Sequence, residues 1–269
     1  MVTSSVTVTL DGETTVVENG EYLFTGLSIG MKELTAQAEG YETYTDNVVI
    51  ELGQNTHDIY MKPILPGPVA HYTFNGDAQD SSGNGNHGTV YGATLVPDRF
   101  GVEGRAYSFD RVDDYIEVER QSFIKPERKE LSVAAWFKLT ANSGATRIVV
   151  ANDFVIYQIQ EELGFTISVP RTQTVRKKVS YNEWLHFVGI YDGTYIKVYI
   201  NGADNPEIYE HPGTISDPGQ NLNFGRDLLD PSNPKYWRGI IDDFRIYDRV
   251  LTEEEINELA SDGPIVISQ

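Results

Sequence analysis

The chain has 269 residues, enough for about two domains, and carries 21 lysines and arginines against 40 aspartates and glutamates, a formal net charge of −19. This charge disfavours nucleic acid and anionic lipid as partners, because both are bound through basic side chains that displace counterions. The sequence contains no cysteine, which excludes disulfides, thiol catalysis and zinc–thiolate sites. No apolar run is long enough to span a bilayer, and 40% hydrophobic residues predict globular domains.

The first segment, residues 1–62, has the pattern of short strands. Val6–Leu10 alternates apolar and polar side chains, and Asn19-Gly20 is typical of a two-residue hairpin turn. Residues 63–68 contain three prolines. Because proline fixes φ and lacks an amide donor, we expect a stiff, extended linker here and a domain boundary.

The second segment, residues 69–262, is also rich in strand patterns. Tyr195–Ile200 alternates between two turn pairs, Asp192-Gly193 and Asn201-Gly202, which predicts a β-meander. The runs 131–138 and 239–247 are rich in β-branched and aromatic residues. These runs place Trp136 in a central strand, where we expect it, with Trp184, to belong to the core.

One helix is predicted near the end of the chain. Thr252 and Glu255 form a capping box, with an apolar stripe behind it. Residues 263–269 read as the start of a linker or a next module, so we expect the chain to be a piece of a longer polypeptide.

Residues 69–260 resemble the laminin G-like, concanavalin A-like jelly-roll domain. Four stretches, in the family's order, carry the resemblance: Val69–Gly88, Ala106–Ile116, Trp184–Gly193 and Gly239–Leu251. Residues 5–62 resemble a carboxypeptidase-regulatory-like, Ig-like β-sandwich, through Glu18–Leu27 and Ala38–Thr43. The resemblance implies an all-β chain in which a small Ig-like sandwich precedes a jelly-roll sandwich.

The loop Asp77–Gly88 has the composition of a calcium site. It gathers carboxylates, side-chain amides and glycines, and calcium prefers six to eight oxygens from such groups. It is not an EF-hand, because the closing glutamate is absent. The resemblance implies that the aspartate opening the last long strand completes the site, with Ca²⁺ bridging the two regions. The predicted ligands are Asp80, Gly83, Asn84, Asn86 and Asp242. A turn that needs no ion remains the alternative.

Catalysis is not expected. The resemblance admits glycoside hydrolases, but the three carboxylates that laminarinase-type enzymes place on alternate residues of one strand are missing. The pairs Asp113-Asp114 and Asp242-Asp243 are adjacent, and in a strand neighbours point to opposite faces. There is no His-Glu-x-x-His or Gly-x-Ser-x-Gly motif, and His186 is expected to be a packed core histidine.

Two surfaces remain as candidate binding sites. Tyr236 and Trp237 follow a loop without a strand pattern, so they form either an aromatic contact surface for a sugar or, for Trp237, a plug at the end of the sandwich. Arg176 and Lys178 lie in a basic stretch, 171–178, which is either a solvated strand edge or a contact for an acidic sugar or a partner's carboxylates.

These observations predict a non-catalytic, calcium-stabilised binding module of a secreted or cell-surface protein. Its expected partner is a carbohydrate or a surface protein, with no nucleic acid and no membrane insertion. The alternative is a purely structural spacer without a small ligand. The sequence leaves the oligomeric state open.

Overall fold

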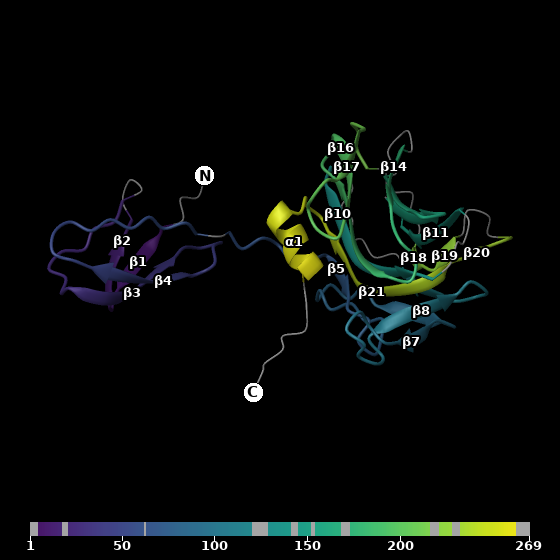
Figure 1. The fold of residues 1–269 in the computed structure, drawn as a ribbon, viewed down its shortest axis with the longest axis horizontal. Coiled ribbons are helices and arrows are strands. Elements are labelled where there is room, and N and C mark those ends of the chain that lie inside the picture. The colour runs from purple at the N-terminus through teal and green to yellow at the C-terminus, as the bar shows by residue number, and fades with distance from the viewer. Residues whose placement is uncertain are drawn as a thin grey trace. The chain divides into compact units, whose positions relative to one another are not determined.

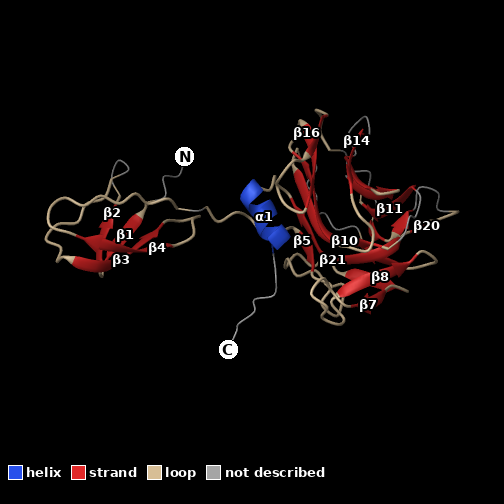
Figure 2. Ribbon diagram, in the orientation of Figure 1, coloured by secondary structure: helices blue, strands red, loops and turns tan. Residues whose placement is uncertain are grey.

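The computed structural model describes residues 5–17, 21–61, 63–119, 129–140, 145–151, 154–167, 173–215, 221–227 and 232–261. The chain is all-β, with one short helix among these residues (Figure 2). It divides into two compact units, Met1–Pro66 and Gly67–Gln269. The predicted Asn19-Gly20 turn and the predicted next module at 263–269 lie outside the described residues, as does part of the basic stretch 171–178.

The first unit contains a four-stranded antiparallel sheet. Its order is β2 (Glu13–Val16), β1 (Thr7–Leu10), β3 (Gly30–Gln37) and β4 (Tyr44–Ile50). Because side chains alternate along a strand, the apolar ones gather on one face. That face is buried at Val8, Leu10, Leu34 and Ala36. The described residues of this unit form this one sheet, so the second sheet of an Ig-like sandwich stays a prediction.

The second unit contains two large antiparallel sheets (Figure 1). The eight-stranded sheet has the order β17 (Glu207–Glu210), β16 (Tyr195–Ile200), β15 (Trp184–Tyr191), β10 (Leu131–Leu139), β21 (Arg238–Tyr247), β8 (Ala106–Asp110) and β7 (Thr94–Val96), with β5 (Ala70–Tyr72) paired to β21. The seven-stranded sheet has the order β14 (Gln173–Lys178), β13 (Glu162–Ile167), β12 (Phe154–Ile159), β11 (Ala145–Val150), β18 (Leu222–Phe224), β9 (Tyr115–Val118) and β6 (Gly88–Tyr91). A short ladder joins β19 (Arg226–Asp227) to β20 (Lys235–Tyr236). This architecture confirms the all-β prediction.

The core of this unit contains Trp237, which is fully buried. Its indole Nε1 donates a hydrogen bond of 2.9 Å to Gln158 Oε1. Its ring centroid lies 5.8 Å from that of Phe109 and 6.4 Å from that of Phe137. A sugar ring cannot stack on an indole without exposed surface, so the prediction of Trp237 as a contact residue is wrong, and the indole is packed inside the domain.

The opposite correction applies to Trp136. On β10 the side chains of residues 131, 133, 135, 137 and 139 are buried in the core, so the even-numbered residues face outward. Trp136 is therefore half-buried on the outer face of the eight-stranded sheet, and Trp184 is half-buried too. The polar neighbours Ser132 and Lys138 at the same alternation are the signal in the sequence that points to this orientation.

The helix α1 (Glu253–Ser261) confirms the capping-box prediction. Glu255 N donates to Thr252 Oγ1, and Thr252 N donates to Glu255 Oε2. The buried Ile256 packs with Val188 and Tyr199 on the outer face of the eight-stranded sheet. The helix contacts β15 of this sheet. The helix thus covers one part of that face.

The predicted meander is present as β15, β16 and β17. Asn201 and Gly202 have the positive φ angles, 57° and 111°, that such turns favour. However, the connection from β16 to β17 runs over residues 201–206, so it is longer than the two-residue turn predicted for it.

Candidate functional site

An aromatic stack lies on the outer face of the seven-stranded sheet. Tyr91 of β6 is directly opposite Tyr115 of β9. Their ring centroids are 4.4 Å apart and their planes 12° apart, while the guanidinium carbon of Arg226 lies 3.6 Å from the centroid of Tyr115. Tyr91 and Arg226 therefore both pack against the ring of Tyr115. Tyr91, at 42% exposure, presents the accessible aromatic surface of this stack.

Polar side chains hold Arg226 in place. Asn223 of β18 is opposite Glu117 of β9, which is opposite Thr89 of β6. Arg226 Nη2 donates to Glu117 Oε1 at 2.8 Å and to Asn223 Oδ1 at 2.7 Å. Asn221 Nδ2 also donates to Glu117 Oε1, at 3.2 Å. Stacking and charge-assisted hydrogen bonds together fix the plane of the guanidinium.

The same face continues across the sheet toward β14. Arg147 Nη1 lies 3.1 Å from Asp227 Oδ1. The ring of Tyr157 lies over Gly164, where an added Cβ would come within 2.3 Å of the ring. Burial raises the pKa of Tyr157 to about 12, so its hydroxyl stays protonated and able to donate.

At the β14 edge, Arg176 Nη1 lies 3.2 Å from Glu162 Oε2. We call this surface the tyrosine–arginine face. Its members share an outward position on the seven-stranded sheet or on the β19 strand beside it: Tyr91, Tyr115, Glu117, Arg147, Tyr157, Glu162, Arg176, Asn223, Arg226 and Asp227.

Three of the predicted contact residues adjoin or belong to this face. The ring of Tyr236 lies 6.5 Å from that of Tyr115, at the stacked end. Arg176 and Lys178 lie on β14, the edge strand at the other end. Tyr115 and Arg226 themselves were not predicted, because the stack joins segments more than a hundred residues apart.

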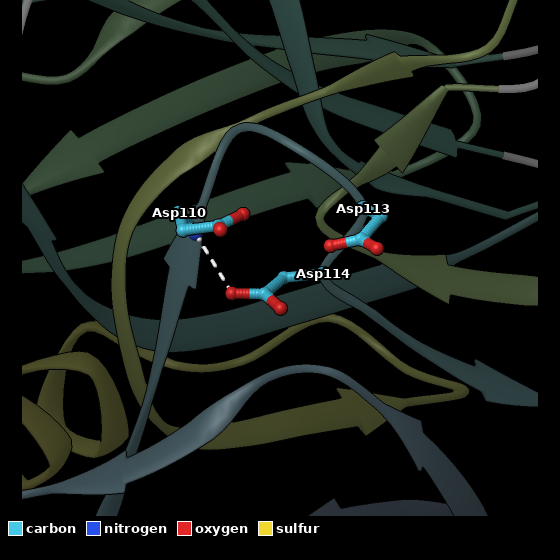
Figure 3. A group of neighbouring side chains, drawn as sticks. All are labelled: Asp110, Asp113 and Asp114. Atoms are coloured by element: carbon cyan, nitrogen blue, oxygen red, sulfur yellow. Dashed lines mark hydrogen bonds between the residues drawn. The ribbon is translucent and has the colours of Figure 1, made fainter.

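A group of acidic side chains borders the stack. The carboxylates of Asp110, Asp113 and Asp114 lie within 4.8 Å of one another, and this is the one such group found among the residues that the structure describes (Figure 3). An added Cβ on Gly92, which follows Tyr91, would lie 2.3 Å from Asp114 Oδ1. We call Asp110–Asp114 the acidic turn. Asp114 thus lies against the residue after Tyr91, and Asp113 and Asp114 directly precede Tyr115 in the chain.

The acidic turn corrects one prediction. Asp113 and Asp114 do not point to opposite faces, because they lie in the turn between β8 and β9 and not in a strand. Asp110 N donates to Asp114 Oδ2 at 2.9 Å and Val112 N to Asp110 Oδ1 at 2.7 Å, so backbone N–H groups stabilise the turn. Burial raises the pKa of Asp114, to which the charges of its two neighbours add.

A second polar cluster lies on the outer face of the eight-stranded sheet. His186, Trp136 and Asp242 are in register across β15, β10 and β21. Arg99 Nη1 lies 2.6 Å from Asp242 Oδ2, and its guanidinium carbon lies 4.9 Å from the ring centroid of Trp136. We call these residues, with Asp243, the Arg99 cluster. Burial raises the pKa of Asp242 to about 7 despite the charge of Arg99.

The Arg99 cluster corrects a further prediction. Arg99 contacts Asp242 and, at 3.8 Å, also Asp243 Oδ2. The two adjacent aspartates do not point to opposite faces, because β21 has a bulge beside Ala135 and Asp243 has a φ of 49°. His71 Nε2 lies 2.7 Å from Asp243 Oδ1. Both carboxylates therefore have cationic or imidazole partners within the protein.

His186 is buried, as predicted, at 2% exposure, but it lies outside the space between the sheets. Its ring centroid is 5.2 Å from that of Trp136. Burial lowers the pKa of His186 to about 3, so the imidazole is neutral in the folded protein at pH 7.

The predicted calcium ligands form a network of hydrogen bonds. Asp80 Oδ1 accepts from the backbone N–H of His71 and of Ser82, each at 2.9 Å. Asp80 Oδ2 accepts from Asn86 N and Asn86 Nδ2 and from Ser82 Oγ. Burial alone raises the pKa of Asp80, but these hydrogen bonds outweigh it and lower the pKa. Asn84 Nδ2 donates to the Val69 carbonyl.

This geometry does not fit the calcium bridge to Asp242. Five donors already surround the Asp80 carboxylate, and a cation needs those lone pairs. Asp242 is neutralised by Arg99 instead. Gly83 has a φ of 87°, so it serves the loop through its conformation. Ca²⁺ binding by the loop alone stays a prediction.

The chain is similar to known proteins in its larger unit. Residues 110–257, more than half of the chain, match the family described as the concanavalin A-like lectin/glucanases superfamily. The chain belongs to this laminin G-like family. The family match begins at residue 110, whereas the resemblance in the sequence begins at Val69. The structure nevertheless includes the earlier strand β5 in this domain, because β5 pairs with β21.

Solved structures share the fold. The receptor-binding domain of a botulinum neurotoxin C/D mosaic serotype matches with a TM-score of 0.58 at 17% identity, covering 72% of this chain and 51% of that one. A botulinum neurotoxin DC binding domain solved with rat synaptotagmin II matches with a TM-score of 0.54 at 18% identity, with the same coverages. A third match, with a TM-score of 0.56 at 17% identity, covers 72% of this chain and 50% of that one, and comes from work describing cell entry of botulinum neurotoxin type C as dependent upon interaction with two ganglioside molecules. The chain spans about half the length of these structures.

No curated protein matches the chain significantly. Among the described residues, no helix is both long and apolar enough to cross a membrane.

Proposed function

We propose that the chain is a non-catalytic carbohydrate-binding module that binds glycans on the tyrosine–arginine face. The observation that carries this proposal is the stack of Tyr91, Tyr115 and Arg226 on an open sheet face, next to fixed carboxylate and amide groups. Aromatic rings pack against the C–H surfaces of sugars, and preoriented polar groups hydrogen-bond their hydroxyls.

The family and the neighbouring structures support a binding role. The matched family includes lectins, and the solved neighbours are described as receptor-binding or binding domains. The Arg99 cluster does not suit catalysis, because Asp242 is buried and both Asp242 and Asp243 are paired with Arg99 or His71. We further propose that the module belongs to a secreted or cell-surface protein, where glycans are met.

A glycan array probed with the full chain tests the proposal. We expect binding that Tyr91→Ala weakens strongly and that Tyr209→Ala leaves unchanged. Tyr209 is a matched control because it is 45% exposed on β17, the edge strand of the other sheet. Equal loss in both variants would contradict the assignment of the face. Silence of the wild-type chain on all glycans would favour the spacer role.

A further inference from the structure

Each of the three arginines of the tyrosine–arginine face is paired with a carboxylate. Arg226 pairs with Glu117, at 2.8 Å. The other two arginines of the face are also paired, Arg147 with Asp227 and Arg176 with Glu162. An acidic sugar that paired with one of these arginines would have to displace its carboxylate, and it would leave that carboxylate without its partner. A sugar hydroxyl avoids this cost, because it can bind the remaining donor and acceptor positions of an intact pair.

The acidic turn adds a repulsive element beside the stack. Asp110 and Asp113 are exposed, and Asp114 lies against Gly92, the residue after Tyr91. A negatively charged sugar stacked on Tyr91 would lie near these carboxylates. Like charges placed together across an interface disfavour the wrong ligand, and the chain as a whole carries −19.

The face is long. Its ion pairs and aromatic rings are distributed from β14 to β6, across all seven strands of the sheet. Strands about 4.8 Å apart give seven strands a width of roughly 29 Å. A single sugar ring covers only a small part of this distance, whereas an oligosaccharide can contact the stack at one end and the Arg147 and Arg176 pairs further along.

We infer that the tyrosine–arginine face takes an uncharged, extended glycan of several sugar residues, with Tyr91 as the stacking platform and the acidic turn rejecting acidic sugars. This inference rests on the proposed carbohydrate-binding function. It names a ligand class that neither the family match nor the fold specifies.

Titration calorimetry on the full chain tests it with neutral oligosaccharides, from disaccharide to hexasaccharide, and with acidic oligosaccharides of equal length that contain uronic or sialic acid. We expect affinity for the neutral series to rise with length and to stay unchanged on adding salt. Tyr91→Ala should weaken binding about tenfold and Tyr209→Ala should not. Asp113→Asn should leave neutral binding unchanged and increase binding of the acidic series.

The outcomes distinguish the two levels of the proposal. Tighter binding of acidic glycans, with an affinity that falls as salt rises, would overturn the inference and leave the proposed function intact. Equal affinity for disaccharide and hexasaccharide would overturn the extended-ligand part. If no glycan of either series binds, the proposed function fails together with the inference.

Discussion

The two sheets of the larger unit present very different outer faces. On the seven-stranded sheet, the Tyr91–Tyr115 stack and its ion pairs are partly open to solvent. On the eight-stranded sheet, α1 covers one region, and Arg99 covers Trp136 and Asp242 in another. Both faces carry aromatic rings, arginines and carboxylates in register across strands.

The difference teaches that composition alone does not identify a binding face. Asp242 has a side chain only 4% exposed, whereas Glu162 on the open face has a side chain 35% exposed. Removing one partner of a buried pair leaves an uncompensated buried charge, so such a pair is costly to break, and its low exposure leaves little for a ligand to contact. An exposed pair contributes little to stability and leaves atoms available for hydrogen bonds.

The largest expected loss of stability is on the outer face of the eight-stranded sheet, which α1 and Arg99 cover. Arg99→Met leaves the buried Asp242 without its cation, and breaking a buried pair costs about 3–5 kcal/mol. Denaturant unfolding of the second unit measures this loss of unfolding free energy. Arg176→Met, on the open face, is the control and should cost less than about 1 kcal/mol.

The double variant Arg99→Met/Asp242→Asn sharpens the test, because it removes both charges. We expect it to recover much of the lost stability. Equal losses of unfolding free energy for Arg99→Met and Arg176→Met would contradict the distinction between the covered outer face of the eight-stranded sheet and the exposed outer face of the seven-stranded sheet.

The next effect is pH dependence from His186. Its folded pKa of about 3 lies below the unfolded value of about 6.5, so the unfolded chain binds a proton that the folded chain cannot. The stability contribution is therefore complete above pH 6.5 and falls as the pH drops toward 3, by about 1.4 kcal/mol per pH unit at most.

Asp242 changes the stability with pH in the opposite direction. Its folded pKa of about 7 exceeds the unfolded value of 3.8, so its contribution to stability is complete below pH 3.8 and is lost as the pH rises through 7.

Unfolding free energies between pH 4 and 6.5, compared for wild type and His186→Gln, isolate the contribution of the histidine. A variant with the wild-type slope would show that His186 is not the group responsible.

The smallest stability effect is expected from chelation. The Asp80 carboxylate accepts five hydrogen bonds and Asp242 is paired with Arg99. We therefore expect a chelator to change the melting temperature of the calcium-equilibrated chain by less than about 1 °C, because a cation would have to displace hydrogen bonds that Asp80 already accepts. A decrease of several degrees would confirm the predicted metal in this loop.

The sequence predicted features that depend on local pattern. The all-β class, the meander and the Thr252–Glu255 capping box follow from alternation, turn residues and spacing, and the structure confirms them. The orientation of Trp136 was also within reach, because Ser132 and Lys138 share its face.

The candidate site could not be predicted in the same way. The stack depends on the pairing of β6 with β9 and of β9 with β18, which are distant in sequence. Likewise, nothing near Asp242 indicates that Arg99, 143 positions earlier in the chain, neutralises it. Trp237 was misplaced because it lies between β20 and β21, directly after a segment without strand pattern, which hides its inward orientation.

The central claim is that glycans contact the tyrosine–arginine face, and amide chemical-shift mapping tests it most directly. A neutral oligosaccharide is titrated into the ¹⁵N-labelled chain. We expect the amides of Tyr91, Glu117, Asn223 and Arg226 to shift with one saturating curve, while those of Lys138 and Val188 on the other sheet stay unchanged. Shifts confined to the eight-stranded sheet, or to the first unit, would contradict the account.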